Sequence, residues 1–187
     1  MMKKMIVFLA VFSCVALFAD NLFFKSSMAP KLHSGTGRGQ QLVFVPETPG
    51  SDIGCWRLEF SDKNRMAELL LKKEIPLPSF EKELKIEMDM ETTPNANLVG
   101  ADMRIKDANY EYCVFNGVKG VKNGKFAAVW TITPGAKVKF SWGKKADKIL
   151  DLPAKISNIA IVLHKPGKHD VTLKNMRFII DGKPAEK

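Results

Sequence analysis

Apolar and polar residues alternate with a period of two over most of the chain, and this pattern constrains the fold more than any other feature. In residues 55–60, Trp56, Leu58 and Phe60 occupy one phase while polar residues and Cys55 occupy the other. Successive side chains of a β-strand point to opposite faces, so this alternation predicts a strand buried on one face. The same alternation recurs in four further runs: 83–90, 126–133, 136–142 and 169–180.

Three runs depart from simple alternation. Residues 158–164 are almost continuously apolar, which predicts a strand covered on both faces. The series in 169–180 changes phase at Lys174-Asn175, which predicts a β-bulge. Residues 67–73 consist of strong helix formers, but their neighbours are strands, so we predict a strand there as well.

Turn-forming residues separate these runs, at 48–50, 93–95, 122–124, 133–135 and 165–167. Each contains the Pro, Gly or Asn residues that reverse an extended chain. About nine or ten short strands within one domain predict an all-β fold, a two-sheet antiparallel β-sandwich of jelly-roll type.

The N-terminus has the features of a secretory signal peptide. Lys3 and Lys4 precede an apolar stretch that ends at Ala19, before Asp20. The stretch is shorter than the roughly 20 apolar residues of a membrane span, and no second run of that length follows. Cys14 offers an alternative, a lipoprotein cleavage site. We therefore predict export to the periplasm or the extracellular space, with residues 1–19 as signal peptide, 20–39 as a flexible lead-in and 40–187 as one domain.

The order of these motifs resembles the galactose-binding-like β-sandwich, a fold common among carbohydrate-binding modules of secreted bacterial proteins. The resemblance covers residues 40–181, and residues 104–112 match its strand–turn–strand unit well. It rests on "CWRLEF" (55–60), "AELLLKKEIPLP" (67–78), "KELKIEMDM" (82–90), "LVGADMRIKDANYEY" (98–112), "FAAVWTI" (126–132) and "DVTLKNMRFI" (170–179). The resemblance implies a non-catalytic binding domain. Such folds often hold a structural calcium, for which Asp52, Asp62 and Asp107 are the acids to check, although no ligand loop can be read here.

Aromatic residues are the first candidates for a sugar site. Trp56 and Trp130 share the phase of their aliphatic neighbours, so we assign them to the core. Trp142 also shares the phase of its neighbours Val138 and Phe140, but it ends its run and precedes Gly143, so it is the best candidate of the three for an exception to core burial. Tyr110 and Tyr112 lie near a turn, and their hydroxyls favour contact with water. We take Trp142, Tyr110 and Tyr112 as candidate ligand-binding residues.

Lysines are the second signal. The chain carries a formal net charge of +9, and loss of Lys3 and Lys4 with the leader leaves +7. Residues 119–148 contain eight lysines and Asp147 as their single acid. Such a block attracts anions, and Lys144 and Lys145 beside Trp142 join the candidate site. The alternative is that these lysines serve only solubility. Export and the lack of a nucleic-acid-binding motif argue against nucleic acid as a partner.

Two cysteines remain after the leader, Cys55 and Cys113, and they either form a disulfide or stay independent thiols. His164, His169 and Asp170 flank one predicted turn and are residue types that bind zinc, but their spacing matches no recognised zinc motif, so we assign no metal ligands. Nothing resembles a nucleophile elbow or a catalytic acid pair, so we predict that the chain is not an enzyme. We expect it to bind polysaccharide, with some preference for an anionic one. The competing hypothesis is a structural or adaptor protein of the cell envelope that binds protein.

Overall fold

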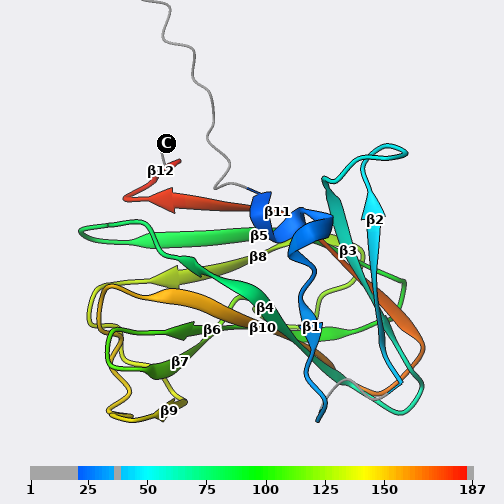
Figure 1. Ribbon diagram of the computed structural model, residues 1–187. Helices are drawn as coiled ribbons and strands as arrows, with labels where there is room; N and C mark the ends of the chain where they lie inside the picture. Colours follow the sequence, from blue (N-terminus) through cyan, green and yellow to red (C-terminus); the bar gives the residue numbers. More distant parts are fainter. Residues whose placement is uncertain (1–20, 36–38, 185–187) are drawn as a thin grey trace, which may run out of the picture.

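Two antiparallel sheets pack face to face in the computed structural model, which describes residues 21–35 and 39–184. The predicted signal peptide and Cys14 lie outside the described residues. Sheet I has the strand order β1 (Lys31–Leu32), β4 (Met66–Pro76), β10 (Lys155–Leu163), β6 (Leu98–Lys106), β7 (Glu111–Asn116) and β9 (Ser141–Gly143). Sheet II has the order β2 (Gln41–Pro46), β3 (Gly54–Phe60), β11 (His169–Ile180), β5 (Leu84–Thr92) and β8 (Lys125–Ile132), with β12 (Lys183–Pro184) paired to β11. Figure 1 shows β5, β8 and β11 in one layer and β6, β7 and β10 in the other. The predicted all-β sandwich is confirmed.

Burial follows the predicted alternation. On β5, Leu84, Ile86 and Met88 are fully buried while the intervening residues are half-exposed. The bulge predicted at Lys174-Asn175 is present, because the pairing of β11 with β5 shifts between Lys174 and Met176. On β5, the strand pattern of the sequence therefore identified correctly which residues face the core.

Residues of high helix propensity form strand β4. Ala67 and Leu69 are fully buried, and β4 pairs with β1 on one side and β10 on the other. Intrinsic helix preference amounts to only a few tenths of a kcal/mol per residue, so burial and pairing between two strands override it. The strand prediction for this segment is confirmed.

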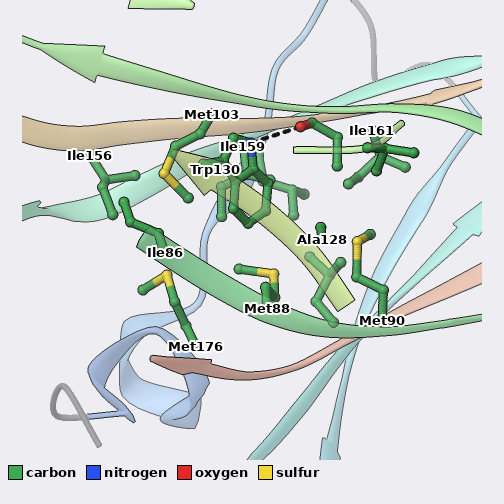
Figure 2. Close-up of a cluster of buried hydrophobic side chains, with 14 of the residues drawn as sticks. Ile86, Met88, Met90, Met103, Ala128, Trp130, Ile156, Ile159, Ile161 and Met176 are labelled. Atoms are coloured by element: carbon green, nitrogen blue, oxygen red, sulfur yellow. Dashed lines mark hydrogen bonds between the residues drawn. The ribbon is translucent and has the colours of Figure 1, made fainter. Parts of the chain in front are cut away.

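Trp130 occupies the centre of the core. Its side chain is fully buried on β8, and its indole Nε1 donates a 2.8 Å hydrogen bond to the carbonyl of Ala101 on β6. Figure 2 shows the ring among side chains from both sheets, including Met103 and Ile159. A Cβ at Gly117 would lie 2.4 Å from the indole, so only glycine leaves room for this ring. Trp130 thus lies in the core, as its sequence phase predicted, and it also joins the two sheets.

The N-terminal segment is part of the core. Two short 3-10 helices, η1 (Asn21–Phe24) and η2 (Ser26–Met28), precede β1. Phe23 and Phe24 are 3% and 1% exposed, and Trp56 Nε1 donates a hydrogen bond to the Phe23 carbonyl. This packing differs from the flexible lead-in predicted for 20–39, because two phenylalanines supply apolar surface that the sandwich buries.

The strand predicted over 136–142 is much shorter in the structure. Lys137 instead forms an isolated bridge with Ile149, and the Val138 N–H donates to the carbonyl of Lys148. Only Ser141–Gly143 forms strand β9. Val138 is buried but Phe140 is 60% exposed, so the shared face predicted for these residues is wrong. Residues 137–138 pair through their backbone with residues 148–149, and this pairing changes the direction of the side chains in the segment.

The two cysteines are free, so the disulfide considered for Cys55 and Cys113 is absent. Cys113 points into the core from sheet I, whereas Cys55 lies half-buried on sheet II, in the phase opposite to Trp56. Side chains on different sheets, one directed inward and one outward, cannot approach to disulfide distance.

Cys113 is expected to resist alkylation in the folded protein. Burial, with added repulsion from Glu111 and Asp107, raises the pKa of this thiol from 9.0 to about 12. Because the thiolate is the reactive form, its fraction at pH 8 should be about 1,000-fold lower than in the unfolded chain. Iodoacetamide labelling followed by mass spectrometry, with and without denaturant, measures this difference. Equal labelling rates in both states would contradict it.

Candidate functional site

The outward face of sheet I gathers the aromatic residues that the sequence singled out. On β6, Ala101, Met103 and Ile105 point into the core, so Asp102, Arg104 and Lys106 point outward. Tyr112 on β7 pairs directly with Lys106 on one side and Trp142 of β9 on the other. Directly paired residues of adjacent strands share a face. We call this surface the outer face of sheet I, defined by Glu68, Glu74, Asp102, Arg104, Lys106, Tyr112, Asn116, Trp142 and Asn158.

Tyr112 and Trp142 stack on each other. Their ring centroids are 5.6 Å apart and their planes differ by 6°. Trp142 remains 41% exposed, although it lies on a strand. An offset parallel pair of this kind presents a broad apolar surface to a ligand.

Cations lie beside each of these rings. The Arg104 guanidinium carbon is 5.0 Å from the Trp142 ring centroid. Lys106 Nζ is 6.0 Å from the Tyr112 centroid and 5.1 Å from that of Tyr110. Lys144 Nζ approaches Tyr110 from the loop after β9, at 5.8 Å. Rings and cations therefore form one continuous cluster, which we call the ring–cation cluster: Arg104, Trp142, Tyr112, Lys106, Tyr110 and Lys144.

Carboxylates on β4 hold two of these cations in place. Glu68, which is buried, forms an ion pair with Arg104 and also accepts a hydrogen bond from Asn158. Glu74 pairs with Lys106 at 3.2 Å, and this hydrogen bond raises the pKa of Lys106 above its ordinary value. The two long side chains are thus fixed in position before any ligand arrives, which reduces the entropy cost of binding.

Asp102 supplies a further polar group on the same face. Asn116 Nδ2 donates a 2.8 Å hydrogen bond to its carboxylate. Burial raises the pKa of Asp102, while Asn116 and the charge of Arg104 act in the opposite direction. Hydrogen-bond acceptors and donors therefore lie on the same face as the exposed rings, as hydroxyl-rich ligands require.

Tyr110 projects from the turn between β6 and β7. The Asp107 carboxylate accepts 2.8 Å hydrogen bonds from the backbone N–H groups of Asn109 and Glu111, which closes the turn. Tyr110 itself has a φ of +62° and is 60% exposed. A bulky residue in this left-handed region is an outlier in protein structures. The turn therefore displays the ring in a conformation that a tyrosine does not favour.

The outward face of sheet II has a different character. Charged residues of β5 and β11 pair with each other there: Lys174 with Glu91 at 2.8 Å, and Arg177 with Glu87 and Asp89 at 2.8 and 3.0 Å. Exposed ion pairs of this kind contribute about 0–1 kcal/mol each and satisfy their own charges. The large exposed rings in the described residues are Tyr110, Phe140 and Trp142, and none of them lies on a strand of sheet II. The outer face of sheet I is therefore the better candidate.

The acids and histidines considered as metal ligands do not come together. In the part of the chain that the structure describes, no three His, Cys, Asp or Glu side chains are arranged to hold a metal ion. Asp52 and Asp62 are exposed, whereas Asp107 is buried and bonded to its own turn. Within the same residues, no helix has the length and apolar character needed to cross a membrane.

Four of the five predicted site residues meet in the ring–cation cluster: Trp142, Tyr110, Tyr112 and Lys144. Lys145 is exposed on the same loop, but the ring contacts of the described residues do not include it. Sequence reasoning missed Arg104 and Lys106. Because Arg104 and Lys106 alternate with Met103 and Ile105, the sequence places both on one outward face of a strand. It does not show that this face lies beside Tyr112 and Trp142.

Neither a protein-family model nor a curated protein matches this chain in sequence. Solved structures do match it in fold. A family 30 carbohydrate-binding module of a Clostridium thermocellum cellulosomal cellulase aligns over 82% of this chain and 92% of its own, with 10% identity and a TM-score of 0.50. The structure of PfGH50B aligns over 84% of this chain but 24% of its own, with 16% identity and a TM-score of 0.51.

A family 11 carbohydrate-binding module from Clostridium thermocellum, solved with a β-1,3-1,4-mixed-linked tetrasaccharide, aligns over 83% of this chain and 85% of its own, with 15% identity and a TM-score of 0.47. This chain spans about a quarter of PfGH50B, so it corresponds to one part of that longer protein. Identities this low establish the fold and nothing further. The chain thus has the β-sandwich fold found in carbohydrate-binding modules.

Proposed function

We propose that this chain is an exported, non-catalytic module that binds polysaccharide on the outer face of sheet I. The observation that carries the proposal is the stacked pair of Tyr112 and Trp142 beside Arg104 and Lys106. Aromatic rings stack on the apolar face of a pyranose, and fixed polar groups bind its hydroxyls. The fold of the family 30 module supports this reading, because that protein is a carbohydrate-binding module with the same architecture.

The open sheet surface suits an extended polymer chain. Directly paired residues form a row across three strands, from Lys106 on β6 through Tyr112 to Trp142 on β9. A second row contains Glu68, Ala160, Asp102 and Asn116. Neighbouring strands are about 4.8 Å apart, so three strands span roughly the length of two sugar rings. The signal-peptide features of the sequence of residues 1–19 support export of the module to the periplasm or the extracellular space.

Replacing Trp142 with alanine is expected to lower affinity for the polysaccharide about 10-fold or more, which is roughly 1.4 kcal/mol. The measurement is retention of residues 20–187 on immobilised neutral and acidic polysaccharides, at low and high salt. Phe140→Ala is the matched control, because Phe140 is an exposed ring outside the ring–cation cluster. The control should bind as the unchanged protein does.

Retention on one polymer that survives high salt and is lost in Trp142→Ala would support a stacking site. Equal loss in Trp142→Ala and Phe140→Ala would contradict it. If no polysaccharide retains the protein, the proposal fails, and the competing hypothesis of an envelope adaptor that binds protein takes its place.

A further inference from the structure

We infer that Tyr110, Lys106 and Lys144 form a subsite for an acidic sugar residue, one that carries a carboxylate or a sulfate group. The inference rests on the proposed polysaccharide-binding role and adds the charge of the ligand. It assigns the sugar ring to the exposed face of Tyr110 and the anionic group to the two ammonium groups.

The geometry brings two positive charges to one exposed ring. Lys106 Nζ lies 5.1 Å and Lys144 Nζ 5.8 Å from the Tyr110 centroid, so the ammonium groups are at most about 11 Å apart. Lys106 comes from β6 and Lys144 from the loop after β9, so the two charges converge from separate segments. A sugar on the ring would lie within reach of both.

Gly143 makes this convergence possible. A Cβ at that position would lie 2.3 Å from the backbone oxygen of Tyr110, and its φ is +133°. Only glycine lets the end of β9 approach the turn so closely. The next residue, Lys144, is thereby placed beside the ring.

The charges around the ring are not balanced. Glu74 pairs with Lys106, but among the described residues no carboxylate lies within ion-pair distance of Lys144. Glu111, which pairs with Gly143 across β7 and β9, is buried, and its carboxylate accepts hydrogen bonds from the backbone N–H groups of Asp147 and Lys148. The ammonium group of Lys144 therefore lacks a counterion, and an anionic ligand would supply one.

The conformation of Tyr110 is an independent observation that points to the same place. Its φ of +62° suits glycine or asparagine better than tyrosine. The backbone holds this conformation through the Asp107 hydrogen bonds of the turn. Strain that a fold maintains at an exposed side chain is a recognised mark of a functional position.

The test compares matched pairs of polymers at 0.15 M salt by isothermal titration calorimetry. Polygalacturonate is paired with its carboxyl-reduced form, and dextran sulfate with dextran. The unchanged protein should bind one acidic polymer at least about 10-fold more tightly than its neutral partner. Whichever pair shows the preference identifies carboxylate or sulfate as the group recognised.

Lys144→Gln should remove this preference, because binding to the acidic polymer should fall about 10-fold while binding to its neutral partner falls much less. Lys122→Gln, an exposed lysine that takes no part in the ring contacts, is the matched control and should keep the preference. Tyr110→Gly should weaken binding to both members of the pair while raising the melting temperature, because glycine removes the strain at this φ.

Equal affinity for acidic and neutral partners would overturn the inference. So would an equal loss in Lys122→Gln and Lys144→Gln, which would mean a general charge effect that salt screens. If neutral polysaccharide still binds and Trp142→Ala abolishes that binding, the proposed function stands while this inference fails. Absence of binding to all four polymers would overturn this inference, and absence of retention on every polysaccharide of the panel would overturn the proposed function as well.

Discussion

Replacing Trp130 with alanine is expected to lower the free energy of unfolding by about 3–5 kcal/mol. The side chain is fully buried and packs between the sheets, and its indole N–H bonds to the Ala101 carbonyl. Neighbouring strands cannot close over so large a cavity, because Gly117 and Ile86 are fixed by their own backbone pairing. Domains of this size are stable by about 5–15 kcal/mol, so the variant should be near its folding threshold. Equilibrium unfolding in urea measures the change.

Two further variants separate the sources of this effect. Trp130→Phe keeps most of the volume but loses the donor, and the Ala101 carbonyl still accepts a 2.9 Å hydrogen bond from the N–H of Gly117. Trp130→Phe should therefore lower the free energy of unfolding by about 1–2 kcal/mol. Trp142→Ala removes an exposed ring and should change stability by less than about 1 kcal/mol. If Trp130→Ala and Trp142→Ala proved equally stable, the assignment of one ring to the core and the other to the surface would be wrong.

Replacing Phe24 with alanine is expected to cost about 3–5 kcal/mol, although this residue precedes the predicted domain. Phe24 is 1% exposed, and it stacks edge-to-face on Phe23 with ring centroids 4.8 Å apart. The Trp56 indole also bonds to the carbonyl of Phe23, which ties the segment to β3. The free energy of unfolding in urea again provides the measurement.

Ser26→Ala is the control for this segment, because Ser26 is exposed two residues away. It should remain within about 0.5 kcal/mol of the unchanged protein. A Phe24→Ala variant as stable as this control would show that the N-terminal segment does not contribute to the core.

The predicted β-sandwich was readable because the period of two is a local property. Each of Leu84, Ile86 and Met88 shows its direction through its immediate neighbours, and all three are fully buried. The same reasoning assigned Trp56 and Trp130 to the core, and both are buried. Phase alone did not set Trp142 apart; its place at the end of its run did, and it is 41% exposed. It failed for Phe140, because backbone pairing between residues 137–138 and 148–149 redirects that segment.

The sequence by itself determined the class of fold, the inward and outward residues of most strands, and the aromatic members of the candidate site. The tertiary structure alone decided that Arg104 and Lys106 lie beside those rings, that Cys55 and Cys113 stay apart, and that Phe24 belongs to the core. The physical reason is the distance along the chain over which each property is determined. Alternation within a strand is set by adjacent residues, whereas strand order and register depend on contacts between segments far apart in the chain. The ring–cation cluster exists because β6, β7 and β9 are neighbours in sheet I, an order that only the folded chain defines.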